Sequence, residues 1–286
     1  MTQLLRQIAA CNTARFPGGR IAFHIGATQV GWLNPAHAKA MAPHPGIAPT
    51  QAGLALSPDH TAQFPATIRA LSTQGFYRWR DEAFDIRATP TSPVLAQIDR
   101  GAVPAFGILA QGVHLNGLVH RPDGPHLWVA KRAANKPLDP GKFDNLVAGG
   151  IPTGHTPEQT LAKEAAEEAA IPKALIQNAT RHASIAYNME TTEGVRRDII
   201  HCYDLILPPD FTPHATDGEV ESFALWPIAQ ALQTVRETDR FKFNVNLALI
   251  DLFLRLDMIP GGEGAALRQA LKEGQGAALD PVKAEP

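Results

Sequence analysis

The chain has 286 residues, of which 44% are hydrophobic and 19% are charged, an ordinary balance for a soluble globular protein with a buried core. Its formal net charge of −2 gives no global reason to expect nucleic acid as a partner, and no uncharged stretch is long and apolar enough to span a membrane. Cys11 and Cys202 are too few for a disulfide framework or a cysteine zinc site, which favours a reducing cytoplasm.

The segment before Asp59 contains no acidic side chain, although it contains Arg6, Arg15, Arg20 and Lys39. A basic bias of this kind is one feature of an organelle transit peptide. We favour a folded segment instead, because Arg20 begins the strand-like run RIAFHI. A cytoplasmic location is therefore expected.

Residues 1–107 are predicted to form a small α+β domain. Helices are expected over residues 4–10, 35–41, 66–74 and 93–101, and strands over residues 20–25 and 82–88. Pro35 suits the start of a helix, whereas Gly75 and Gly101 suit helix ends.

Longer β-rich segments follow in residues 108–258, the second predicted domain. The runs 113–121 and 126–133 flank RPDGP, whose Asp-Gly turn predicts a hairpin. Further strands are expected at NLVAGG and over residues 179–187, 196–207 and 219–226, and helices over 228–235 and 246–256. This order predicts an α/β sandwich rather than a doubly wound sheet. Residues 259–286 are expected to form a weakly helical, mobile tail.

A helix is predicted at roughly residues 157–170, inside the second domain. Thr156 is a good N-cap, Pro157 takes the first helical position, and Gln159 completes a capping box. The helix is expected to end before Pro172, because the residue preceding a proline avoids helical geometry.

Three glutamates, Glu164, Glu167 and Glu168, fall within an arc of about 100° on this helix. Like charges so placed weaken a helix, whereas a hard divalent cation with oxygen ligands would stabilise them. The alternative is an ordinary solvated helix, for which EAAEEAA is typical. The preceding strand, Gly149-Gly150 and the loop before the cap favour a metal site.

The stretch GGIPTGHTPEQTLAKEAAEEAAI, residues 149–171, resembles the Nudix box. That motif is a glycine, five residues, Glu, seven residues, and Arg-Glu-apolar-x-Glu-Glu-x-Gly-apolar. Three positions depart from it: His155 replaces the first glutamate, Lys163 the arginine and Ala170 the last glycine. In the family the first two are generally structural, so the departures question the rigidity of the loop more than metal binding.

The similarity extends to GVHLNGLV, LWVAKRAANKPLDPGKFDNLVAGGI, FKFNVNLALIDLFLR and, in the first domain, WRDEAFDI. These runs resemble the Nudix subfamily with an N-terminal extension of unknown function (DUF4743-like). The resemblance implies an α/β/α sandwich with a mixed sheet that binds Mg²⁺ or Mn²⁺ and hydrolyses a small-molecule diphosphate. Some fungal and plant members act on damaged thiamine diphosphate analogues, so thiamine diphosphate or its oxidised forms are the first expected substrates.

Two other functions stay open. One is a Nudix hydrolase of nucleotide conjugates such as ADP-ribose, CoA or NADH. The other is a non-catalytic ligand-binding Nudix domain, suggested by His155 and Lys163. Retention of all three glutamates disfavours it, since a site without metal has no reason to hold like charges together. The oligomeric state is open between a monomer and a homodimer.

The resemblance implies that Glu164, Glu167 and Glu168 are both metal ligands and catalytic residues. A fourth carboxylate is expected from the strand EVESFALW, where Glu219 and Glu221 alternate onto one face. We prefer Glu221 as the catalytic group, with Glu219 as the alternative metal ligand.

Substrate binding is assigned to Lys131, Arg132, Gly149 and Gly150. Arginine suits bidentate phosphate contact, so Arg132 is preferred within the basic cluster upstream of the helix. For each cation of that cluster, the alternative is an ordinary solvated loop. Asp144 is expected to brace the turn.

Overall fold

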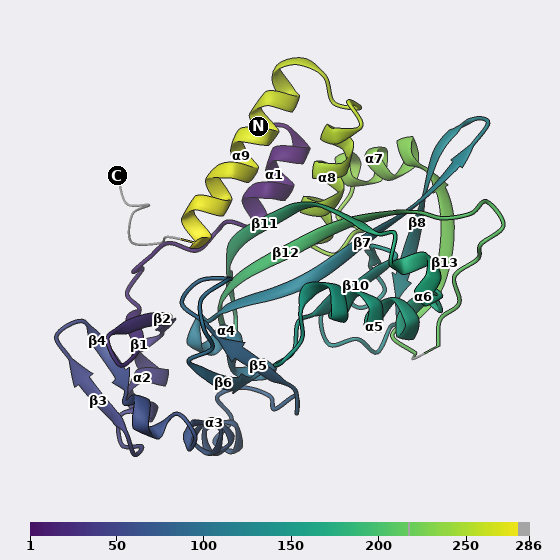
Figure 1. Cartoon of the computed structure of the whole chain (residues 1–286). Coiled ribbons are helices and arrows are strands. Elements are labelled where there is room, and N and C mark those ends of the chain that lie inside the picture. Colours follow the sequence, from purple (N-terminus) through teal and green to yellow (C-terminus); the bar gives the residue numbers. More distant parts are fainter. Residues whose placement is uncertain (217, 280–286) are drawn as a thin grey trace.

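The computed structural model describes residues 1–216 and 218–279 and has two domains, each with its own hydrophobic core (Figure 1). One core is built from residues 23–108 and belongs to the N-terminal domain. The other core lies in the C-terminal domain, on one face of a large sheet. A third hydrophobic cluster lies on the opposite face of the same sheet.

The N-terminal domain combines short helices with two small sheets. Its strands are β1 (Ile21–Ile25), β2 (Thr28–Leu33), β3 (Ile47–Thr50), β4 (Gly53–Leu56), β5 (Ala83–Ile86) and β6 (Ala96–Asp99). Its helices are α2 (Pro35–Met41), α3 (Phe64–Thr73) and α4 (Val103–Phe106). One sheet has the order β2-β1-β4-β3, and β5 pairs with β6 in the other.

The helix predicted over residues 93–101 is wrong. Residues 96–99 are the strand β6, followed by a short 3-10 turn over Arg100–Ala102. Ala96 and Ile98 are buried on either side of the exposed Gln97, which is the period of a strand. Pairing with β5 satisfies the backbone groups that a helix would have satisfied internally.

The C-terminal domain is built on a mixed sheet with the order β11-β12-β7-β8-β13, to which β10 and β9 add at β7 and β8. The strands are β7 (Leu109–Arg121), β8 (Gly124–Arg132), β9 (Phe143–Asp144), β10 (Val147–Gly150), β11 (Thr180–Thr191), β12 (Gly194–Ile206) and β13 (Val220–Pro227). The helices are α1 (Gln3–Ala10), α5 (Pro157–Ala169), α6 (Lys173–Ile176), α7 (Ile228–Glu237), α8 (Val245–Arg255) and α9 (Gly261–Leu279). The predicted hairpin is confirmed as β7 and β8.

Side chains of this sheet alternate between two helical layers. Ile200 and Cys202 of β12 pack in the core that includes residues of α1, α7, α8 and α9. Tyr203 and Leu205 pack on the other face, against α5 and α6. The domain is therefore an α/β/α sandwich, as predicted.

The two ends of the described chain pack together on one face of the sheet (Figure 1). Leu4 of α1 and Leu267 of α9 are fully buried in the same core. Residues 261–279, which belong to the predicted weakly helical tail, form the 19-residue helix α9. Residues 280–286 of that predicted tail lie outside the described residues.

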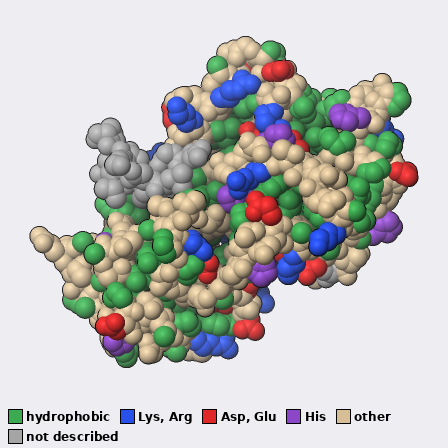
Figure 2. All heavy atoms as spheres, viewed as in Figure 1, with side chains coloured by type: hydrophobic (Ala, Val, Ile, Leu, Met, Phe, Trp, Pro, Cys, Tyr) green, Lys and Arg blue, Asp and Glu red, His purple; other side chains and the backbone are tan. Residues whose placement is uncertain are grey.

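Acidic and basic side chains are interspersed on the face seen in Figure 2, rather than gathered into one patch. This distribution agrees with the small net charge. Within residues 1–216 and 218–279, no helix has both the length and the apolarity needed to cross a bilayer.

Candidate metal and anion site

Helix α5 is placed by the local signals that the sequence contains. The Thr156 hydroxyl accepts from the Gln159 N–H at 3.2 Å, and Gln159 Oε1 accepts from the Thr156 N–H at 2.9 Å. At the other end Ala170 takes a left-handed conformation with φ of 53°. Alanine therefore occupies a backbone geometry that favours glycine, and the helix still ends where predicted.

Glu168 is a buried carboxylate on the inner side of α5. Only 7% of its surface is exposed, and Oε2 accepts a 2.9 Å hydrogen bond from the backbone N–H of Ala148 in β10. Burial raises the pKa of Glu168 well above its usual value, despite that hydrogen bond. No Lys, Arg or His among the described residues forms an ion pair with it.

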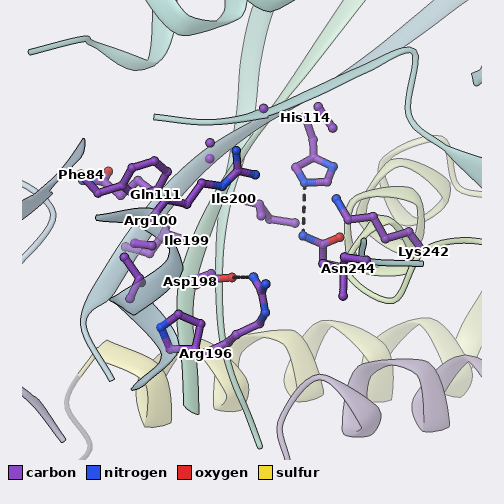
Figure 3. A pocket seen from close by; sticks show the side chains of 18 of the residues that line it. Phe84, Arg100, Gln111, His114, Arg196, Asp198, Ile199, Ile200, Lys242 and Asn244 are labelled. Carbon is purple, nitrogen blue, oxygen red and sulfur yellow. Dashed lines mark hydrogen bonds and ion pairs between the residues drawn. The ribbon is translucent and has the colours of Figure 1, made fainter. Parts of the chain in front are cut away.

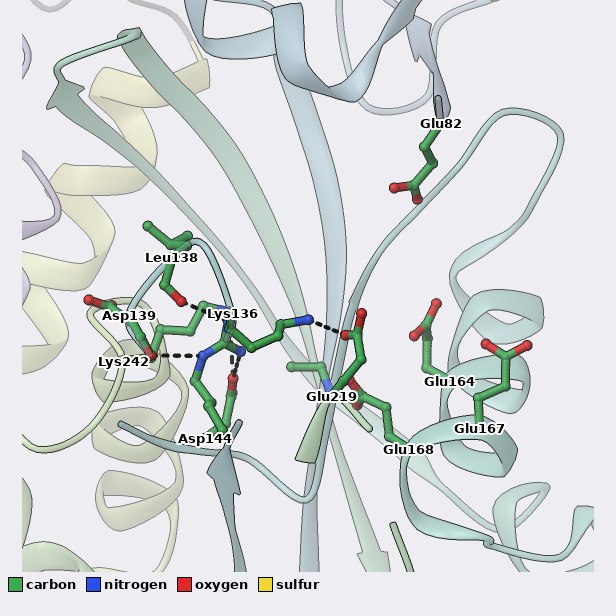
Figure 4. Close-up of polar contacts among 12 residues, drawn as sticks. Glu82, Lys136, Leu138, Asp139, Asp144, Glu164, Glu167, Glu168, Glu219 and Lys242 are labelled. Atoms are coloured by element: carbon green, nitrogen blue, oxygen red, sulfur yellow. Dashed lines mark hydrogen bonds and ion pairs between the residues drawn. The ribbon is translucent and has the colours of Figure 1, made fainter. Parts of the chain in front are cut away.

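Glu164 lies one turn earlier, against the glycine-rich end of β10. An added Cβ on Gly149 would lie 2.5 Å from both Cγ and Cδ of Glu164, so only glycine leaves room for this side chain. Burial also raises the pKa of Glu164. Figure 4 shows Glu164, Glu167, Glu168 and Glu219 gathered at the same end of the sheet.

The two outer carboxylates of this group, Glu167 and Glu219, form ion pairs with lysines. Lys163 Nζ lies 2.6 Å from Glu167 Oε2, and Lys136 forms an ion pair with Glu219. Burial would raise the pKa of Glu219, but Lys136, with smaller contributions from Arg100 and Arg132, lowers it below the usual value. Lys163 Nζ also lies 3.5 Å from Glu164 Oε1, so among the described residues Glu168 is the one carboxylate of the four without an ion pair.

The structure places Glu219, rather than the preferred Glu221, beside the other carboxylates. Glu219 borders the cavity beside α5, whereas Glu221 lies outside it and forms a 2.7 Å ion pair with Lys131. A register shift between Val220 and Ser222 breaks the alternation that would have put both glutamates on one face. The strand therefore directs only one of them into the site.

The structure places Lys131 and Arg132, the two cations predicted to bind substrate, in different surroundings. Lys131 lies on the exposed strand edge with Glu221, away from the cavity. Arg132 borders the cavity, but its three guanidinium nitrogens donate to Asp139 O, Leu138 O and Asp144 Oδ2. Arg132 therefore braces the loop between β8 and β9, and Asp144 has the bracing role predicted for it.

A cavity of about 650 Å³ runs between the two domains and is bordered by the predicted glycines and carboxylates. From the C-terminal domain it is lined by Gly149, Gly150, Glu164, Glu167 and Glu219. The N-terminal domain contributes Arg80, Glu82, Arg100, Gly101 and Pro104. The site is therefore an interdomain cleft, the usual place for a small-molecule site.

A smaller recess of about 130 Å³ continues from this cavity, and both share Gly149, Gly150 and Arg100 among their walls. Figure 3 shows Phe84 and Arg100 on one side of the recess and Lys242 and Asn244 on the other. Burial lowers the pKa of His114 in its wall to about 4, so this imidazole is neutral near pH 7.

A divalent cation fits the chemistry of the carboxylates. Within residues 1–216 and 218–279, no three His, Cys, Asp or Glu side chains stand close enough to hold a metal in the conformations described. However, a cavity of about 10 Å³, on the scale of one water or ion, lies between Glu168, Glu219 and Asp144. Arg132 and Lys136 also line this cavity and pair with Asp144 and Glu219, so a cation there would compensate chiefly Glu168, and carboxylate oxygens are its preferred ligands.

Sequence reasoning missed the residues that the cavity takes from distant segments. Arg80, Arg100, Arg196 and Lys242 border it, and only their positive charge could have suggested them. Lys136, a further cation of the basic segment between residues 131 and 142, also borders the cavity. His155 lies elsewhere, at a second cavity beside the start of α5, and so does not meet the carboxylates.

Gly149→Ala is expected to displace the Glu164 carboxylate and to weaken Mg²⁺ binding about tenfold or more, because the new methyl group overlaps that side chain. Isothermal titration calorimetry with Mg²⁺ measures the effect. Gly262→Ala is the matched control, since a Cβ there meets nothing within 4 Å. Unchanged Mg²⁺ affinity in Gly149→Ala would show that Glu164 does not hold the cation.

Comparison with known proteins gives matches to both domains. Residues 3–110 match a domain of unknown function (DUF4743), and residues 111–245 match the NUDIX domain. Nudix hydrolase 20, chloroplastic, of Arabidopsis thaliana is 39% identical over 198 residues, which are 69% of this chain and 53% of that protein. Nudix hydrolase 24, chloroplastic, of the same plant is 38% identical over 202 residues, or 70% and 55% of the two chains. The chain thus spans about half the length of the curated relatives it matches.

Among solved structures, a protein from Deinococcus radiodurans covers 59% of this chain and 97% of its own at 22% identity, with a TM-score of 0.47.

Proposed function

We propose that this chain, whose residues 111–245 match the NUDIX domain and whose residues 3–110 match DUF4743, is a Nudix hydrolase that cleaves a diphosphate with the help of a divalent cation. The observation that supports this most is Glu168, a buried carboxylate without an ion-pair partner among the described residues. Such a group costs folding free energy unless a cation or a proton compensates it.

Glu164 and Glu168 would hold the cation, with Glu219 and Glu167 on its outer side. A bound Mg²⁺ or Mn²⁺ spreads the negative charge that develops on the phosphate oxygens. Lys136 and Lys163 lie beside the outer carboxylates and place positive charge near the substrate phosphates. One carboxylate of this group would accept the proton of the attacking water.

A non-catalytic ligand-binding domain is the rival function, and the glutamates argue against it. Two of them are buried or half-buried with raised pKa values, and a third needs a lysine partner. Retaining these charges together has a cost, and a bound cation would offset it for the buried Glu168, which has no ion-pair partner among the described residues. The rival predicts Mg²⁺-independent ligand binding without turnover.

The finer proposal is that the substrate is thiamine diphosphate or one of its oxidised forms. It is supported by the sequence resemblance to thiamine-related Nudix proteins and by the modest recess of about 130 Å³ beside the diphosphate cavity. A small heteroaromatic group between Phe84 and Phe243 suits this recess better than a nucleoside with its ribose. ADP-ribose, CoA and NADH are the competing substrates.

The full chain is expected to release phosphate from thiamine diphosphate or its oxo and oxy forms with higher kcat/KM than from ADP-ribose, CoA or NADH. Selectivity must come from contacts to the organic half, since the carboxylates treat every diphosphate alike. Chromatography of the products with Mg²⁺ gives the comparison. A tenfold or greater preference for ADP-ribose or CoA, about 1.4 kcal/mol, would contradict the thiamine proposal and leave the general hydrolase.

A cytoplasmic location and a choice between monomer and homodimer stay predictions. The two Arabidopsis relatives are named as chloroplastic, which is said of those proteins. Fractionation of cells and light scattering of the purified chain would test the two points.

A further inference from the structure

The N-terminal domain packs directly on the loop between β10 and α5. The Thr153 N–H in this loop donates to Ala83 O of β5 at 2.8 Å. An added Cβ on Gly150 would lie 2.7 Å from Cζ of Phe84, so the loop backbone contacts that ring closely. Contacts from the other domain therefore support the loop whose usual bracing residues are replaced by His155 and Lys163.

The wall that this domain turns toward the cavity is organised around one buried carboxylate. Asp99, with 5% of its surface exposed, accepts hydrogen bonds from the N–H groups of Arg80 at 3.0 Å, Glu82 at 3.3 Å and Gly101 at 2.8 Å. Asp99 thus holds two backbone segments, residues 80–82 and the turn at Gly101, next to each other. Arg80 and Arg100 are presented from this rigid turn.

Arg100 is oriented within the wall. Its Nη1 lies 2.8 Å from Glu82 Oε2, its guanidinium lies 5.9 Å from the centre of the Phe84 ring, and about half of its side chain is exposed. Arg100 borders both the large cavity and the recess. Its charge also contributes to lowering the pKa of Glu219, so it acts across the cleft on the carboxylate side.

Arg80 differs from the other cations around the cavity. Lys136, Lys163 and Arg132 each have a carboxylate partner. Arg80 is exposed, borders the cavity, and forms no side-chain hydrogen bond or ion pair with any residue in the described part of the chain. It is therefore available to an anion, and a guanidinium matches phosphate oxygens in a bidentate way.

We propose that Arg80 and Arg100 of the N-terminal domain bind the phosphate of the substrate that lies away from the carboxylates. This inference rests on the proposed diphosphate hydrolase and deepens it. Glu164, Glu167 and Glu219 line the cleft from the C-terminal domain, and Arg80 and Arg100 line it from the N-terminal domain. In this arrangement one phosphate of the substrate lies on the carboxylate side and the other contacts the arginines, so both domains contribute to binding.

The test compares Arg80→Gln, Arg100→Gln and their double variant with Arg78→Gln in the full chain. Arg78 is exposed, belongs to the same segment and borders none of the described cavities, so it is a matched control. The double variant is expected to raise KM about tenfold or more, with kcat within about threefold, because ground-state and transition-state phosphate binding are lost together. Arg100→Lys keeps the positive charge but not the planar guanidinium, so its KM should lie between those of wild type and Arg100→Gln.

A binding measurement separates this inference from the proposed function. Calorimetry with methylenediphosphonate, whose P–C–P bridge resists hydrolysis, in Mg²⁺ should show an increase in Kd of about tenfold in the double variant and none in Arg78→Gln. Unchanged KM and Kd in the double variant would overturn the inference about the arginines. If the wild-type protein turned over substrate in the same assays, the proposed hydrolase function would still stand. Arginine-dependent binding without any turnover would support the inference and contradict the hydrolase.

Discussion

Glu168→Gln is expected to reduce turnover by at least about 100-fold at saturating Mg²⁺, whereas its thermal midpoint measured in EDTA is not expected to fall below that of wild type. Glutamine keeps the shape of the side chain and can still accept from the Ala148 N–H, so packing is preserved. It carries no charge with which to hold a cation, and metal stabilisation of the transition state is worth several kcal/mol. Steady-state kinetics and differential scanning calorimetry measure the two effects.

Glu221→Gln is the matched control for this variant. It makes the same substitution in the strand β13, where Glu221 lies outside the cavity and forms an exposed ion pair with Lys131. Its turnover is expected to stay near that of wild type, and its stability within about 0.5 kcal/mol. Full activity in Glu168→Gln, or equal inactivity in both variants, would contradict the assignment of the metal site.

The features that could be predicted are those specified by neighbouring residues. The start of α5 follows from Thr156 and Gln159, which satisfy backbone groups within the same turn of helix. The β7–β8 hairpin follows from the Asp-Gly turn between two apolar runs. The three helix glutamates follow from helical periodicity, and the structure gathers them as expected (Figure 4).

The features that could not be predicted depend on residues far apart in the chain. The bulge near Glu221 arises where β13 pairs with β8, and no pattern in the neighbouring residues predicts it. The strand β6 was read as a helix because four residues are too few to establish a period. The pairing of α1 with α9 and the arginine wall both require the tertiary fold, since they join segments from different parts of the sequence.

The same buried carboxylates predict how stability depends on pH and metal. Burial disfavours the charged form, so the folded-state pKa values of Glu164 and Glu168 lie above the ordinary glutamate value of about 4.3. Below the ordinary glutamate pKa both carboxyl groups are protonated in the folded and the unfolded protein, so they do not reduce the free energy of unfolding. As pH rises through their folded-state pKa values, the metal-free protein must ionise buried groups, and its free energy of unfolding falls. Glu219 and Asp144 have lowered pKa values and act in the opposite direction, so total stability alone does not isolate the effect.

We therefore expect a crossover between wild type and Glu168→Gln when urea unfolding is followed from pH 4 to pH 8. In EDTA the variant should become the more stable protein as pH rises, because it has no buried charge to ionise, and the two should converge toward pH 4. At pH 7.5 with Mg²⁺ at 100 times its Kd, wild type should gain about 2.7 kcal/mol, and the variant little. Because ligands must be deprotonated to bind, this gain should fade toward pH 4. A pH-independent difference, or equal stabilisation of both proteins by Mg²⁺, would mean that Glu168 is a structural carboxyl group rather than the centre of a cation site.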